Sequence, residues 1–199
     1  LDVPHAPTPA KEVIEHGPKG EVKGRFQASH PGSYAVVDAW KREPLLGKSE
    51  GVEIEFYVQP WMLNAPHPQA ILSNLDAAKG AGIAVLLDRD DNIVVWIGTA
   101  NGVETKKIAS ASRERRWFRV CITIKGKDFQ LQLSHIASGN ETAPGPTTVH
   151  TTLSAVPRLD SASPLYFAAT LAANPTSAPD LLAHFFNGRL EAPRFQAWG

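Results

Sequence analysis

Apolar side chains recur at every second position in several short runs, and no segment of the 199 residues carries a sustained helical repeat. The clearest run is 52–58, where valine, isoleucine and phenylalanine fill the even positions and Glu53, Glu55 and Tyr57 fill the odd ones. A second run, 129–133, alternates phenylalanine and leucine with glutamine. Successive side chains of a strand point to opposite faces, so these runs predict strands with one face in a core and the other toward solvent.

Further short runs bounded by turn residues predict more strands. Two pairs of runs are separated by a few acidic, Asn, Lys or Gly residues, which is typical of hairpins. Strands and turns in this order indicate an all-β fold, an antiparallel two-sheet jelly-roll sandwich. The additional predicted strands are 33–37, 70–74, 82–88, 92–98, 117–124 and 165–169.

Residues 185–195 supply the strand that is expected to close the fold. An Asn-Gly turn leads into a short strand that should end at Pro193, because proline has no N–H to donate to a ladder. Such a strand needs a partner far upstream. The candidates are 32–37 and 51–58.

This long-range closure predicts one domain over residues 25–199. Residues 1–24 are rich in proline up to position 18 and contain few large apolar residues, so they are expected to form an extended arm or linker. The chain begins at Leu1 without a methionine, and we expect it to be a piece of a larger protein.

The charge balance excludes some classes of partner. Twenty basic and twenty acidic residues give a formal net charge of zero, so no field favours nucleic acid or an anionic membrane surface. Neither a membrane-spanning run nor a signal-peptide pattern is present in the sequence. The single cysteine, Cys121, has no internal partner for a disulfide, which favours a reducing cytoplasm.

The order of these strand signals resembles the laminin-G-like, or concanavalin A-like, jelly roll. A narrower set of motifs, Arg25-Phe26-Gln27, Pro31 to Val37 and His184 to Phe195, resembles the lectin-like domain of the N,N-dimethylformamidase large subunit. In that family a separate downstream domain hydrolyses a small formamide with an iron held by tyrosines and a carboxylate. No counterpart of that iron site occurs in these 199 residues, so no cofactor is expected in this chain.

The resemblance implies a non-catalytic accessory or structural module of a larger amidohydrolase, with sister domains or subunits as partners. Two alternatives stay open, a stand-alone carbohydrate-binding module and a jelly-roll glycoside hydrolase. In the second alternative Glu53 and Glu55, on one face of one strand, would be nucleophile and acid. The solvated face of a strand is the simpler interpretation of the two glutamates, and a buried structural thiol that of Cys121.

Three residues are the predicted ligand contacts. Trp61 stands in a proline-rich loop, where an aromatic ring can serve as a sugar platform. Asp88 and Asn92 flank a turn with Asp90 and Asp91, and these oxygens are of the kind that calcium prefers, although a hairpin turn uses the same residues without a metal. No residue is assigned as catalytic or as a metal ligand.

The remaining candidates have structural explanations. Trp96 and Trp117 lie in predicted strands and are expected in the core. No two of the seven histidines have a metal-ligand spacing on one element. Asn140 begins an N-glycosylation triplet that we interpret as chance. The other tryptophan considered is Trp40, and the histidines are His5, His16, His30, His67, His135, His150 and His184.

Overall fold

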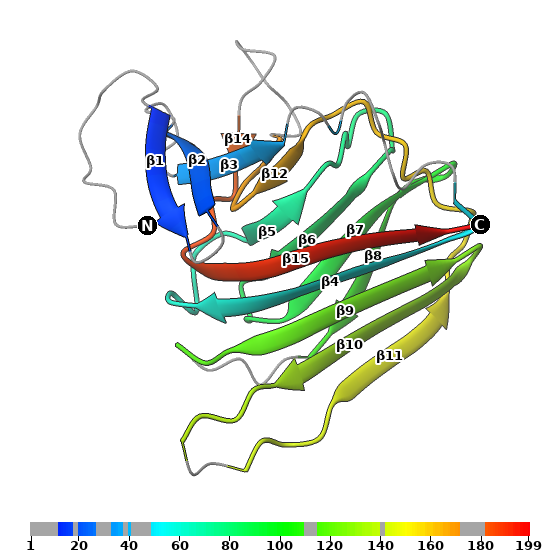
Figure 1. Cartoon of the computed structure of the whole chain (residues 1–199). Helices are drawn as coiled ribbons and strands as arrows, with labels where there is room; N and C mark the ends of the chain where they lie inside the picture. Colours follow the sequence, from blue (N-terminus) through cyan, green and yellow to red (C-terminus); the bar gives the residue numbers. More distant parts are fainter. Residues whose placement is uncertain are drawn as a thin grey trace.

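Two antiparallel sheets face each other in the computed structural model, which confirms the predicted all-β sandwich (Figure 1). The structure describes residues 12–17, 20–26, 33–37, 40, 49–109, 115–139, 142–171 and 182–199. Asn140 and the whole segment 172–181 therefore lie outside the described residues.

The larger sheet has eight strands in the order β1-β2-β3-β12-β5-β6-β7-β8. All its neighbouring strands pair antiparallel. The strands are β1 (Glu12–Gly17), β2 (Gly20–Phe26), β3 (Ser33–Val37), β12 (Leu165–Phe167), β5 (Gln69–Ser73), β6 (Ile83–Leu87), β7 (Ile93–Thr99) and β8 (Gly102–Ile108).

The smaller sheet has five strands in the order β11-β10-β9-β4-β15. A pair of two-residue strands, β13 (Thr170–Leu171) and β14 (Leu182–Ala183), forms a third, minor sheet. The five strands are β11 (Thr147–Thr152), β10 (Asp128–His135), β9 (Phe118–Lys125), β4 (Gly51–Pro60) and β15 (Gly188–Trp198).

The main core lies between the two sheets. The four apolar residues of the run 52–58 are each no more than 2% exposed, as the alternation predicted. They pack with the inward side chains of β9 and β10 and with Ile71, Val85, Val95 and Ile97 from the larger sheet. The period of two in the sequence thus fixes which face of each strand is buried.

The closing strand β15 pairs with β4, one of its two predicted partners. The predicted end at Pro193 is wrong, because β15 runs on to Trp198. A register shift between Glu191 and Arg194 leaves two residues out of the pairing, and Ala192 in this bulge has a φ of 46°. β15 is an edge strand, where a bulge accommodates a proline that would break an interior strand.

Strand pairing also begins earlier than the composition indicated. β1 and most of β2 lie within residues 1–24, where an extended arm was expected, and they pair over six residue positions. On its other side β2 pairs antiparallel with β3. The stretch 10–17 contains no proline, so the prolines around it do not prevent a ladder there.

The strands β8 and β11 were not predicted. β8 alternates half-buried and exposed residues up to its last position, and β11 contains four threonines around Val149 and His150. Both strands lie at the edge of a sheet, so each pairs with one neighbouring strand only. Edge strands need few apolar residues, so their sequences do not stand out from loops.

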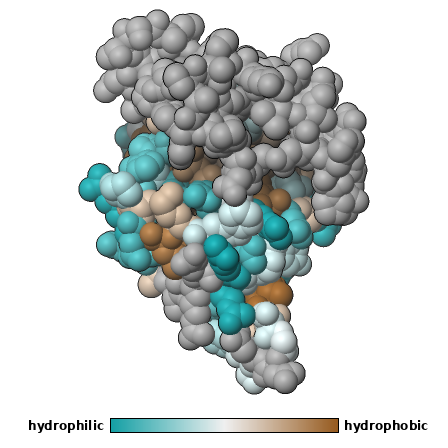
Figure 2. Space-filling view, turned by 90° about the vertical axis from the view of Figure 1, so that its left-hand side faces the viewer, coloured by the Kyte–Doolittle hydropathy of each residue, from teal (hydrophilic) through white to brown (hydrophobic). Residues whose placement is uncertain are grey.

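The larger sheet also carries apolar residues on its second face. Trp96, expected in the main core, packs instead on this outer side against Ala70, Leu75, Ala84 and Leu86. Phe185 joins the outer cluster around Tyr166, Ala169 and Leu182, at the minor sheet. The coloured surface in Figure 2 shows hydrophobic residues in small groups among hydrophilic ones.

In the described part of the chain, no helix is long and apolar enough to cross a membrane.

Candidate functional site on the outer face of the five-stranded sheet

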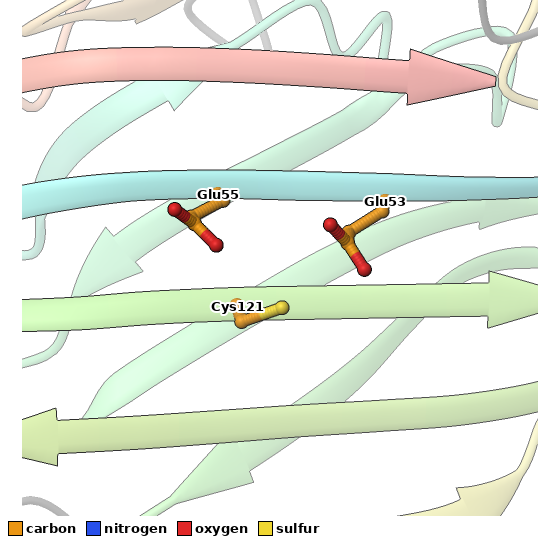
Figure 3. A group of neighbouring side chains, drawn as sticks. All are labelled: Glu53, Glu55 and Cys121. Atoms are coloured by element: carbon orange, nitrogen blue, oxygen red, sulfur yellow. The ribbon is translucent and has the colours of Figure 1, made fainter.

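The outer face of the smaller sheet gathers the polar residues that alternate with its core positions. On β4, Glu53 and Glu55 project from this face, and Cys121 of β9 is the residue directly opposite Glu55 (Figure 3). One ligand atom from each of these three side chains lies within 4.8 Å of the other two. Strand register alone brings them together, because directly opposed and diagonal side chains on one face are neighbours.

Glu55 is paired with a cation that the sequence analysis did not single out. Arg119, two residues before Cys121 on β9, donates from Nη2 to Glu55 Oε2. This bond raises the pKa of the Arg119 guanidinium above its ordinary value, although burial acts in the opposite direction. Glu55 is only 9% exposed, so it is more enclosed than the predicted solvated strand face. The pairing of β4 with β9, which brings Arg119 beside Glu55, is the information that the sequence analysis lacked.

Burial and two carboxylates raise the pKa of the Cys121 thiol. Burial is the largest cause that raises the pKa of Cys121, and the negative charge of Glu53 follows it. Arg119 and a hydrogen bond with Thr123 act in the opposite direction but are outweighed. The thiolate is the reactive form of cysteine, so a raised pKa slows the alkylation of this residue. Cys121 is half-buried on the outer face, not buried in the core as the sequence analysis expected.

We expect Glu53→Gln to speed the alkylation of Cys121 by iodoacetamide several-fold at about pH 8. Removing the carboxylate charge lowers the pKa of the thiol and raises the thiolate fraction. Glu191→Gln removes a charge from the same sheet face but from a residue that does not perturb Cys121, and it serves as control. The rate follows from mass spectrometry of the quenched protein. An equal rate in wild type and Glu53→Gln would contradict the electrostatic explanation.

Among the residues that the structure describes, Glu53, Glu55 and Cys121 form the one group whose ligand atoms are placed to hold a metal ion. Two carboxylates and a thiol suit a borderline cation such as Zn²⁺, provided that the thiol loses its proton. Glu55 also serves Arg119, so a cation would share that carboxylate with a guanidinium. Two carboxylates on one sheet face are also the minimum set for a glycoside hydrolase.

Aromatic rings stand at both ends of this face. At one end Arg189 of β15 lies 5.1 Å from the ring centre of Trp61, and Trp61 Nε1 donates to Gln59 Oε1 at 3.0 Å. At the other end, a Cβ at Gly51 would meet Trp198 Nε1 at 2.5 Å, so the indole lies directly over this glycine. Trp61 was a predicted ligand contact, whereas Trp198 was overlooked because it follows the expected end of the last strand.

Charges of both signs lie between the two ends. On β15, Arg194 is opposite Glu55 and Glu191 is opposite Tyr57, and both are exposed. At the end of the face, Lys125 of β9 and Asp128 of β10 add one charge of each sign. Three carboxylates and three guanidinium groups share the rest of the face and balance one another. They are Glu53, Glu55 and Glu191 against Arg119, Arg189 and Arg194.

Asp88 and Asn92, the other two predicted contacts, close the hairpin between β6 and β7. Asp88 Oδ1 accepts from the backbone N–H groups of Asp90 and Asn92, at 2.9 and 2.8 Å, and Lys107 Nζ lies 3.2 Å from Oδ2. Burial would raise the pKa of Asp88, but the bonds from Asn92 and Lys107 outweigh it and lower the pKa. A calcium ion would compete with these donors for the same oxygens.

The hairpin meets the loop that carries Trp61, through a bond from the Asn64 N–H to Asp91 Oδ1 at 2.9 Å. This bond joins the two loops, but it does not bring Trp61 together with Asp88 or Asn92, the other predicted ligand contacts.

On the outer side of the larger sheet, His67 and His184 have ring centres 6.4 Å apart although the sequence separates them widely. Burial, followed by the charge of His67, lowers the pKa of His184.

A cavity of about 270 Å³ opens at the end of the sandwich near Gly51. It lies between the start of β4 and the segment 156–160, and Glu50, Arg158 and Asp160 are its charged lining residues. It is separate from the carboxylate pair, because neither Glu53 nor Glu55 lines it.

Comparison with known proteins found no matching family model and no matching curated protein. Among solved structures, the LG1-3 region of the laminin alpha2 chain has a TM-score of 0.57 at 14% identity over 76% of this chain and 28% of its own. Tailspike protein 2 of the Escherichia coli O157:H7 bacteriophage CAB120 has a TM-score of 0.58 at 12% identity, over 95% of this chain and 25% of its own.

A third similar structure is the Ruminococcus gnavus IT-sialidase CBM40 bound to alpha2,3 sialyllactose. Its TM-score is 0.54 at 14% identity, over 79% of this chain and 78% of the CBM40 chain. The chain thus spans about a quarter of the laminin and tailspike chains but most of the CBM40 domain. Identities of this size relate folds alone. The fold of this chain is the laminin-G-like jelly-roll sandwich.

Proposed function

We propose that this chain is a non-catalytic carbohydrate-binding module that holds a neutral glycan along the outer face of the five-stranded sheet. The observation that carries the proposal is the arrangement of this face. Trp61 with Tyr57 and Trp198 stand toward opposite ends of β4, and hydrogen-bonding side chains fill the space between them. The shared fold with a carbohydrate-binding module supports the proposal as analogy.

The chemistry of the face suits sugars. Aromatic rings offer apolar faces to the C–H groups of a pyranose, while carboxylates, guanidinium groups and amides bind its hydroxyls. Ten residues of β4 at about 3.3 Å each give a track of about 30 Å, which is long enough for several sugar rings. Since the charges balance, the face favours a neutral glycan over an acidic one.

A glycoside hydrolase is the second candidate function. The approach of Glu53 and Glu55 favours it, because retaining hydrolases hold their carboxyl groups about 5–5.5 Å apart. The ion pair of Glu55 with Arg119 argues for a structural use of at least one carboxylate. We therefore place binding before catalysis.

The accessory role in an amidohydrolase remains a proposal that rests on the sequence motifs at 25–37 and 184–195. In that setting the sandwich would pack against sister domains or subunits, and the lone Cys121 would agree with a reducing cytoplasm. The native reading frame tests it. A downstream domain with a tyrosine and carboxylate iron site would support the role, and a frame that holds this chain alone would overturn it.

Titration calorimetry with neutral oligosaccharides, chosen from a glycan array, tests the binding proposal. We expect Trp61→Ala to weaken binding about tenfold, because a lost stacking contact of about 1.4 kcal/mol corresponds to a factor of ten in affinity. Trp96→Ala is the matched control, since Trp96 is also half-buried but lies on the outer side of the other sheet.

Three results would overturn the proposal. They are the absence of any neutral glycan among the bound ligands, tighter binding of sialyllactose than of neutral sugars, and full affinity in Trp61→Ala. Release of reducing ends by wild type, lost in Glu53→Gln and Glu55→Gln, would favour the hydrolase instead.

A further inference from the structure

The edge strand β11 presents a row of backbone groups with no partner in the sheet. Leu153 N–H donates inward to the Lys127 carbonyl at 2.8 Å, whereas the Thr152 carbonyl accepts outward from Lys106 Nζ at 3.3 Å. Backbone direction alternates along a strand, so the N–H and C=O groups of Thr148 and His150 also point away from β10. Both residues are exposed.

Two other strands that end a sheet are protected against such pairing. β15 carries Pro193, the bulge before Arg194 and several exposed charges. β8 is covered near its middle by the end of β11 and the segment after it, because Glu104 Oε2 accepts from the backbone N–H and hydroxyl of Ser154, and Lys106 Nζ donates to the carbonyl of Thr152, the last residue of β11. Charges, proline and bulges are the usual means of blocking an edge.

Over residues 147–151 β11 has none of these features, and only Thr152 at its end is bonded to β8. Its sequence is Thr-Thr-Val-His-Thr-Thr, with no charge, proline or bulge over six residues and in unbroken register with β10. It reads almost the same in both directions. Antiparallel pairing of two copies about a two-fold axis at Val149 therefore places no charge opposite another.

We propose that β11 is the interface with a second copy of this chain, and that the two five-stranded sheets join edge to edge. In this register Thr148 of one copy faces His150 of the other, and each such pair exchanges two backbone hydrogen bonds. The two Val149 residues form the central pair without hydrogen bonds, with their side chains on the core side, where Val149 already packs. The occupant follows from the self-complementary sequence and from the absence of charge on either partner.

The contact is small. Edge pairing over five residues buries far less than the roughly 1,200–2,000 Å² of a standard interface, so the dimer should form and dissociate with concentration. The inference is independent of carbohydrate binding, because Trp61 and Trp198 lie at the opposite edge of the same sheet.

Disulfide trapping tests the register directly. In full-length chain carrying Cys121→Ser, we expect Val149→Cys to give a covalent dimer under mild oxidation, since opposed residues of a non-bonded pair lie within the Cα separation that a disulfide needs. Val103→Cys is the matched control, because Val103 lies on the other edge strand β8 and is 39% exposed. It should remain monomeric at the same protein concentration.

Sedimentation velocity over a concentration series gives the second measurement. His150→Pro removes an outward N–H that makes no bond in the β10 ladder, so it should leave the fold intact and weaken dimerisation at least about tenfold. Circular dichroism checks the fold, and Thr148→Lys is the alternative variant if it is lost. A chain that stays monomeric throughout, a dimer that survives both substitutions, or equal trapping at positions 103 and 149 would overturn the proposal. So would a monomer that binds an extended peptide at this edge instead of its own copy.

Discussion

Replacing Phe56 by alanine is expected to lower the free energy of unfolding by about 3–5 kcal/mol. Phe56 is fully buried at the centre of β4, where its ring packs between the two sheets. Truncation removes the burial of the ring and leaves a cavity that rigid strands on both sides cannot close. Equilibrium denaturation in urea, compared by midpoint and slope, gives the difference.

The adjacent Tyr57→Ala is the control. Tyr57 is also aromatic and on the same strand, but it projects from the outer face and is only half-buried. We expect a loss of about 1 kcal/mol there. Equal losses at positions 56 and 57 would contradict the assignment of inner and outer faces.

Gly82→Ala is the second large effect, with an expected loss of about 2–5 kcal/mol. Gly82 has a φ of +95°, and a Cβ there would collide with the carbonyl of Asn74. Three backbone segments cross at this point. Gly82 N–H donates to the Arg158 carbonyl, Arg158 N–H to the Gly98 carbonyl, and Gly98 N–H to the Gly82 carbonyl.

Gly102→Ala separates the two causes. Gly102 has a similar φ of +101°, but a Cβ there would meet no atom within 4 Å. It should cost about 1–2 kcal/mol from backbone conformation alone. Thermal unfolding monitored by circular dichroism measures both variants. If Gly82→Ala costs no more than Gly102→Ala, the crossing is not close-packed.

The alternation in residues 52–58 and 129–133 was sufficient to predict which side chains of these two strands lie in the main core. The hairpins at 82–98 and 117–133 were also predictable, because their turn residues stand between two strong apolar runs. β8 and β11 were missed because an edge strand buries little and needs no apolar pattern. The last strand was predicted to end at Pro193, because the sequence does not show whether the missing N–H of a proline would have faced a partner strand.

Only some residues of the candidate site could be predicted from the sequence. Glu53 and Glu55 share a face by their spacing alone, and Trp61 stood out in its loop. Arg119 and Trp198 could not be connected with them. Glu55 and Arg119 are 64 positions apart in the sequence, and only the pairing of β4 with β9 brings them together.

The sequence by itself determined the strands with strong alternation, their buried faces and the all-β class, since these follow from a period of two and from local turn chemistry. Only the tertiary structure decided the order of strands in each sheet, the ion pair of Glu55 and the edge left open at β11. These features depend on which strands pair at long range. Many registers satisfy the same local pattern, and the packing of the whole core selects one of them.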